Sequence, residues 1–127
     1  MANKYNLKKI VRVVHPLIRV KMNHFLRKNM YKKFVVLDIP LLIENNLNKK
    51  KDVLVFVESK KSQINLYLKK RKNYNKKVIE NLRKLQKTVA YKKKLSTYII
   101  KNDFKLSTVK KRVKFIKNII LNERNSS

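Results

Sequence analysis

Glycine is absent from all 127 residues of the sequence. Glycine supplies positive φ angles and allows the backbone to approach a phosphate group closely. Neither a phosphate-binding loop of the Walker type nor the glycine-rich fingerprint of dinucleotide-binding folds can be written without it. The sequence therefore excludes a nucleotide-cradling loop of either kind within these residues.

Cysteine is also absent, which excludes disulfides, zinc-thiolate sites and cysteine nucleophiles. The longest apolar runs, residues 34–37 and 39–43, are far shorter than the ~20 residues that cross a bilayer. Residues 1–9 are polar and basic and lack the apolar segment of a secretory signal. We therefore expect a cytoplasmic protein that does not associate with membranes.

Acidic residues are few, with 7 against 35 basic residues, and the net charge is +28. Such a charge is typical of nucleic-acid-binding proteins, because lysine and arginine neutralise phosphates. However, lysine outnumbers arginine 28 to 7, asparagine occurs 15 times, and both lysine and asparagine have A/T-rich codons. A dedicated nucleic-acid reader uses more arginine, and the basic residues here are scattered. We favour drift in base composition and expect only non-specific nucleic-acid binding; a basic nucleic-acid-binding module is the alternative.

The pattern of apolar residues alternates between helix and strand. Asn6 is expected to cap a short helix that runs to about Val14. After an interruption at His15-Pro16, apolar residues at helical spacing run from Pro16 to Asn29. Apolar, β-branched stretches predict strands, and three- or four-residue spacing with Ser59 or Ser62 and Ser107 as caps predicts the later helices. The strands are expected at 33–38, 52–57 and 98–100, a turn at 41–47, and helices at 59–72, 76–86, 89–95 and 107–121.

Strands this apolar, separated by helices, predict an α/β fold with a short parallel sheet flanked by helices in three layers. Such a sheet needs both faces covered and its edges protected. Three strands are few for that purpose, which indicates that part of a larger sheet is absent.

Two short segments have specific sequences. The first reads HPLIR over residues 15–19, and the second reads VVLDIPLLIE over residues 35–44. Both resemble the dephospho-coenzyme A kinases, a family of P-loop kinases. In that family a histidine-proline-leucine stretch begins a helix, and a later buried strand ends in proline-leucine-leucine-x-glutamate.

The order of the following residues is also similar to that family. A strand is followed by a helix that has Gln63 near its start and basic residues at its end. Next come a helix that closes on Gln86, a basic position at Lys92, and the stretch YIIKN over residues 98–102. The resemblance covers residues 7–121, and the joint order of the motifs is more specific than any one of them.

The resemblance implies a partial P-loop kinase fold and an ATP-dependent kinase that phosphorylates the 3′-hydroxyl of dephospho-coenzyme A, the last step of coenzyme A synthesis. ATP and Mg²⁺ would be needed by the intact family enzyme. The resemblance also implies a single partial domain over residues 1–127. Within it, residues 1–31 form a helical substrate-side region, 32–58 and 96–121 the core sheet and helices, and 59–95 a helical, lid-like region.

The sequence departs from the family because the glycine-rich loop and an early aspartate are missing. The helix after Gln63 also lacks the arginine expected near Leu66, and Thr97 stands where an aspartate is usual. We therefore expect the chain alone to be inactive, whether as a truncated gene, a fragmentary gene prediction or half of a split enzyme. A split enzyme needs an amino-terminal P-loop segment as its partner, and a non-catalytic scaffold is a further alternative.

The resemblance suggests substrate-side and nucleotide-side residues but no catalytic residue. The substrate-side set is His15, Arg19, Pro40, Leu41, Leu42 and Glu44, and the ATP or lid set is Lys70, Arg71, Lys92 and Asn102. Each has a structural alternative, such as a helix-end charge or a turn residue. Asp38 is a weak candidate for organising Mg²⁺, and capping of the following turn is favoured for it.

Overall fold

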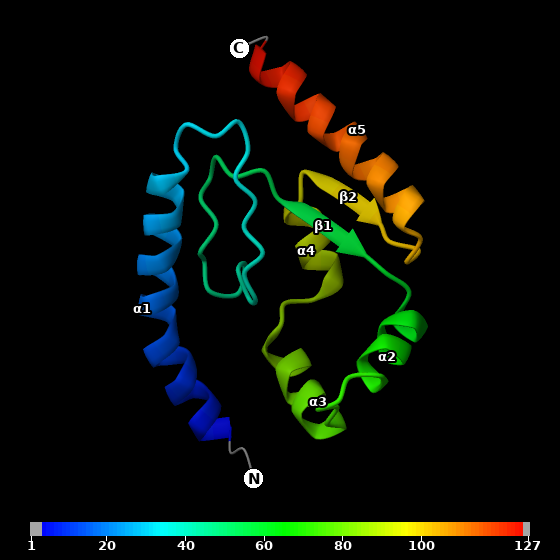
Figure 1. Ribbon diagram of the computed structural model, residues 1–127. Coiled ribbons are helices and arrows are strands. Elements are labelled where there is room, and N and C mark those ends of the chain that lie inside the picture. Colours follow the sequence, from blue (N-terminus) through cyan, green and yellow to red (C-terminus); the bar gives the residue numbers. More distant parts are fainter. Residues whose placement is uncertain (1–3, 126–127) are drawn as a thin grey trace.

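The computed structural model describes the backbone of residues 4–125 and the side chains of residues 16–123 and 125 (Figure 1). Helices and strands alternate along it, which confirms an α/β fold with a short parallel sheet. The elements are α1 (Lys4–Lys28), β1 (Val55–Glu58), α2 (Lys61–Lys69), α3 (Lys76–Leu85), α4 (Val89–Leu95), β2 (Tyr98–Lys101) and α5 (Leu106–Asn125).

The sheet consists of β1 and β2, which pair in parallel with Val55 opposite Tyr98. The backbone N–H of Tyr98 donates to the carbonyl of Leu54 at one end of the pair. At the other end, the N–H of Asn102 donates to the carbonyl of Glu58 over 2.7 Å. Helices α2, α3 and α4 form the crossover connection that parallel strands require. Helix α5 returns along the sheet and packs against β2 (Figure 1).

Helix α1 is continuous, so the predicted break at His15-Pro16 is wrong. Pro16 lies inside the helix, where its ring removes one backbone hydrogen bond to the preceding turn. One missing bond does not end a helix whose flanking turns keep theirs, and a proline in mid-helix can be accommodated locally.

The strand predicted at residues 33–38 does not form. Residues 34–39 belong to neither a helix nor a strand, and Figure 1 shows them as a bare cyan trace. A strand exists only where a neighbouring strand accepts and donates backbone hydrogen bonds. In the described chain the sheet ends at β1 and β2, so this β-prone segment has no partner. Among the described residues the sheet therefore has two strands, and not the three that the sequence predicted.

The helix caps differ in part from those predicted. Neither Ser59 nor Ser62 caps α2, whose N-cap residue is Lys60, with no side-chain bond. Helix α5 begins at Leu106, so Ser107 lies inside its first turn; the turn before it is closed by Asp103, whose carboxylate accepts from the N–H of Lys105. The α3 helix begins at residue 76 as predicted, because the side chain of Asn75 caps it.

The apolar core is small. Met22, Leu47 and Ile100 are the buried apolar side chains in the described part of the chain. Large apolar side chains remain exposed on the sheet and beside it, among them Val57 and, at 83% exposed, Val36. Residues 41–47 form hydrogen-bonded turns, as predicted, and these turns bring Leu47 into the core. No helix among the described residues is long and apolar enough to span a membrane.

Replacing Asn75 with alanine should lower the free energy of unfolding by about 1 kcal/mol, because the Asn75 side chain accepts from the N–H of Val78 over 3.1 Å. Urea unfolding followed by circular dichroism measures the change. Asn73→Ala is the matched control, since Asn73 is an exposed turn residue before the cap. Equal losses for the two variants would contradict the capping role of Asn75.

Candidate functional site

A hollow of about 460 Å³ opens where the carboxyl ends of β1 and β2 lie side by side. Open α/β sheets bind ligands at this edge, because loops and helix starts converge there. Its lining comes from the ends of both strands, the start of α2 and the first turns of α5. The lining residues are Glu58, Ser59, Lys60, Gln63, Lys101, Asn102, Asp103 and Arg112.

Both carboxylates of the hollow have partners. Glu58 forms an ion pair with Lys93, and the hydrogen bond from Lys93 holds the pKa of Glu58 below its ordinary value. Asp103 accepts from the backbone N–H of Lys105 over 3.0 Å, and this bond is the main reason why the pKa of Asp103 is lowered. Both groups are therefore anionic at neutral pH.

The cations of the hollow are less engaged than its carboxylates. Among the described residues, Lys60 and Arg112 form no ion pair. Lys101 lies close enough to Glu58 to contribute to the lowered pKa of that carboxyl group. Because three cations line the hollow and its carboxylates are already paired, the hollow suits an anionic ligand.

An aromatic stack lies next to the hollow, although neither of its rings lines it. The rings of Tyr67 on α2 and Phe104 after β2 lie parallel, with their centroids 4.4 Å apart. Asn102 supports the same turn, because its side-chain oxygen accepts from the N–H of Phe104 over 2.8 Å. The stack joins α2 to the turn before α5, and Phe104 has a φ of 62° in this turn.

The lid residues predicted at the end of α2 do not line the hollow. Lys70 lies with its Nζ 5.7 Å from the centre of the Tyr67 ring, a cation–π distance. Arg71 is exposed just beyond α2, and its backbone N–H donates to the carbonyl of Leu68. The structure thus separates Asn102, which lines the hollow, from Lys70 and Arg71.

A second cluster joins residues that are far apart in the sequence. The Glu44 Oε1 atom accepts from the Lys92 Nζ and from the backbone N–H of Lys87, both over 2.8 Å. Lys92 Nζ also lies 3.5 Å from the side-chain oxygen of Gln86. The Glu44 side chain is only 8% exposed and that of Lys92 18%. The cluster ties the turn at 41–47 to the start of α4.

Burial alone would raise the pKa of Glu44 above its ordinary value of 4.5. The hydrogen bond from Lys92, backbone N–H groups and the charge of Lys92 act against burial, and the net pKa is lowered. Glu44 is therefore ionised at neutral pH. Its Oε1 atom is engaged by both Lys87 and Lys92.

The remaining substrate-side residues surround the same turn. Arg19 reaches from α1 and donates to the carbonyl of Asn45 over 3.1 Å. Leu41 has a φ of 57°, a conformation that costs a branched residue about 1 kcal/mol. Pro40 is exposed and Leu42 half-buried, and the side chain of His15 lies outside the described residues.

Asp38 does not fit a magnesium site. Its side chain is exposed, and it lies in residues 34–39, which form neither a helix nor a strand, so it is not at the end of a strand. Across the described residues, acidic and histidine side chains form no group of three that could hold a metal ion. Magnesium binds through carboxylates together with substrate phosphates, and one exposed carboxylate supplies too little of that set.

The sequence missed most of the hollow. Nothing in the local sequence distinguishes Lys60, Lys101 and Arg112 from the other scattered basic residues, and the pairing of Tyr67 with Phe104 has no local signal. Their position in the sequence was the available signal, since Lys60 and Lys101 come shortly after stretches predicted as parallel strands.

A family model, CoaE: Dephospho-CoA kinase, matches residues 1–108 of the chain. The match includes both motif segments and the Glu44, Gln86 and Lys92 positions. No curated protein matches the chain.

Glu44→Gln should reduce stability at neutral pH by about 1–2 kcal/mol, because Lys92 then loses its ion-pair partner. The folded-state pKa of Glu44 is lowered, so its contribution is present above pH 4.5 and is lost as the pH falls through the folded pKa. Urea unfolding at neutral and acidic pH should show a flatter acid slope in the variant.

Glu80→Gln is the control for this experiment. Glu80 is exposed on α3, and its replacement by glutamine removes the same charge. An acid slope that flattens equally in both variants would show that general charge, and not the Glu44–Lys92 contact, sets the pH dependence.

Proposed function

The chain belongs to the dephospho-CoA kinase family, and from this membership we propose that its ancestral reaction is ATP-dependent phosphorylation of the ribose 3′-hydroxyl of dephospho-coenzyme A. The single observation that carries the proposal is the meeting of Glu44, Gln86 and Lys92. These three positions were assigned from separate family motifs. Unrelated α/β chains have no reason to bring such positions together.

The hollow at the carboxyl ends of the strands is the proposed nucleotide subsite. Phosphoryl transfer depends chiefly on positioning and on cations that neutralise developing charge. Lys60, Lys101 and Arg112 supply cations there, and Asn102 offers an amide beside them for a base. Lys70 and Arg71 lie outside this hollow, so we propose that they act only after α2 moves as a lid.

The substrate-side region is proposed to lie around the turn at 41–47. Arg19 anchors α1 to this turn through Asn45, and Glu44 anchors the turn to α4. We therefore assign Glu44 and Lys92 a positioning role and leave Pro40, Leu41 and Leu42 as the pocket wall. We propose the same region boundaries as the resemblance implies, 1–31, 32–58 with 96–121, and 59–95; the turn at 41–47 belongs to the second region and meets the first through Arg19.

The 127 residues supply no phosphate cradle, because a Walker loop requires glycine. Nor does Asp38 provide a magnesium site, so no step of the reaction is assigned to a metal held by these residues. We propose that this chain alone performs no turnover. A separate segment that carries a strand and a glycine-rich loop would supply the missing cradle. We propose that the enzyme formed in this way is cytoplasmic.

The unpaired residues 34–39 and the exposed valines of β1 support this proposed partner. Both stretches are mostly apolar, and β1 pairs with β2 along one edge only in the described chain. An added parallel strand would satisfy backbone groups and cover side chains such as Val36 and Val57.

The purified 127-residue chain should give no detectable phosphorylation of dephospho-coenzyme A in a coupled assay with ATP and Mg²⁺. The reason is the missing cradle for the β- and γ-phosphates. Turnover above the rate without protein, retained after repurification, would defeat the proposal.

A separately produced segment with a strand and a Walker loop should restore turnover when mixed with the chain. The same segment with its loop lysine replaced by alanine is the control and should bind without restoring turnover. Restored turnover by the control segment would contradict the proposed role of the loop.

A further inference from the structure

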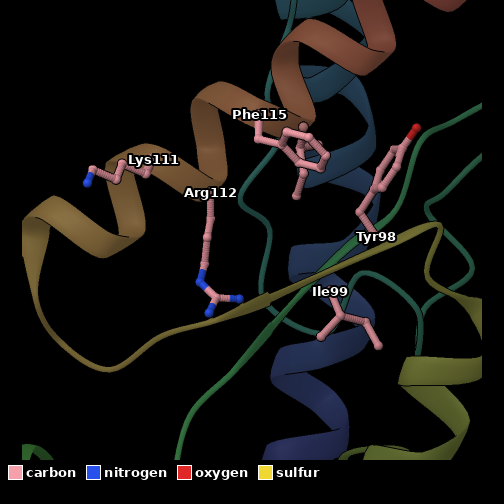
Figure 2. Close-up of a pocket in the computed structure, with 6 residues that line it drawn as sticks. Tyr98, Ile99, Lys111, Arg112 and Phe115 are labelled. Atoms are coloured by element: carbon pink, nitrogen blue, oxygen red, sulfur yellow. The ribbon is translucent and has the colours of Figure 1, made fainter.

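A shallow groove of about 380 Å³ lies between β2 and α5. Of its lining residues, Arg112 alone is also assigned to the kinase reaction. Its lining residues are Tyr98, Ile99, Lys111, Arg112, Phe115 and Ile116. Figure 2 shows the rings of Tyr98 and Phe115 on the same side of β2, with Arg112 reaching from α5 toward the strand. Phe115 is 66% exposed, so this ring presents a flat apolar surface to solvent.

The helix beside the groove is densely cationic. Its exposed basic residues through the middle of the helix are Lys110, Lys111, Arg112, Lys114 and Lys117. The one acidic residue of α5 is Glu123, near its far end, where the carboxylate accepts from the hydroxyl of Tyr98. Arg112 forms no ion pair among the described residues. The groove therefore combines the unpaired positive charge of Arg112 with the exposed ring of Phe115 and the half-buried ring of Tyr98.

Arg112 connects this groove to the hollow at the carboxyl ends of the strands, because it lines both. A cationic surface thus continues from Lys111 through Arg112 to Lys101 and Lys60. A ligand that follows this course needs negative charges at intervals and flat groups between them. Single-stranded nucleic acid has that chemistry, since its phosphates repeat and every base has a face that stacks on an aromatic ring.

Other occupants fit the groove less well. A second copy of this chain also carries a net charge of +28, so the two copies repel each other. An acidic peptide satisfies the cations, but it offers nothing that requires the exposed ring of Phe115. Charge complementarity together with the ring therefore favours a nucleic-acid strand.

We propose that the groove between β2 and α5, with Arg112 at its centre, binds single-stranded nucleic acid without sequence preference. Base stacking on Phe115 supplies the part of the affinity that does not depend on salt. Contacts from Arg112 and the lysines of α5 to phosphates supply the part that does. The proposal does not rest on the kinase assignment.

The test measures binding of a short fluorescent oligo(dT) by anisotropy over a series of salt concentrations. Phe115→Ala should weaken binding at least about fivefold with an unchanged salt slope, because one stacking contact is lost. Arg112→Gln should reduce the slope of log affinity against log salt by about 0.7, the value for one phosphate contact on a single strand. Circular dichroism confirms that each variant is folded.

Two matched controls lie elsewhere on the chain. Tyr31→Ala removes an aromatic side chain that is 91% exposed on the loop after α1, and Arg27→Gln removes an exposed arginine of α1. Both should leave the affinity within about twofold, because neither residue lines the groove. If Phe115→Ala binds like Tyr31→Ala and Arg112→Gln like Arg27→Gln, attraction is diffuse and the proposal fails. The proposal also fails if poly-glutamate binds as tightly as oligo(dT) and Phe115→Ala changes the affinity for neither ligand.

Discussion

The parallel pairing of β1 with β2 is the contact on which the other features depend. It joins residues that are more than forty positions apart in the sequence, so α2, α3 and α4 must fold into one crossover. Because the strands are parallel, their carboxyl ends meet at one edge. The hollow, the Tyr67–Phe104 stack and the start of α5 all lie at that edge. The short ladder thereby positions the side chains that line the hollow.

The same pairing leaves the sheet incomplete. Two four-residue strands bury little, and only Met22, Leu47 and Ile100 are buried apolar side chains among the described residues. Small domains depend on buried apolar area to offset conformational entropy, and here much of that area is still exposed. The polar ties at Glu44 and Arg19 therefore carry an unusual share of the tertiary organisation, since they connect α1, the 41–47 turn and α4.

The pattern of apolar and capping residues predicts those elements that depend on interactions between residues close in the sequence. The helices at 76–85 and 89–95 follow from apolar spacing and from caps at Asn75 and Thr88, which act within three residues. The segment at 33–38 has strand propensity, but its partner is not among the described residues, and propensity cannot supply one. A rule for proline that considers only adjacent residues predicts a helix boundary at Pro16. It leaves out the helical turns on either side, through which α1 continues.

The candidate site was predicted unevenly for the same reason. Motif order identified Glu44, Gln86 and Lys92 as positions, but their contact is a property of the fold and appeared only in the structure. Cations such as Lys60 and Arg112 could not be separated from the other 33 basic residues until the fold placed them at one hollow. Composition explains why the chain is basic, whereas position decides which cations face a ligand.

The absence of glycine imposes a cost at the places where the fold turns sharply. Leu41, Asn46 and Phe104 have φ angles of 57°, 50° and 62°, in the region that glycine occupies most easily. Asparagine tolerates that region, but leucine and phenylalanine do so only where neighbouring contacts compensate. Phe104 has its stack with Tyr67, and Leu41 lies in a turn held by Arg19 and Glu44. The strained positions therefore coincide with the two clusters because the ties that build the clusters also hold the backbone in these conformations.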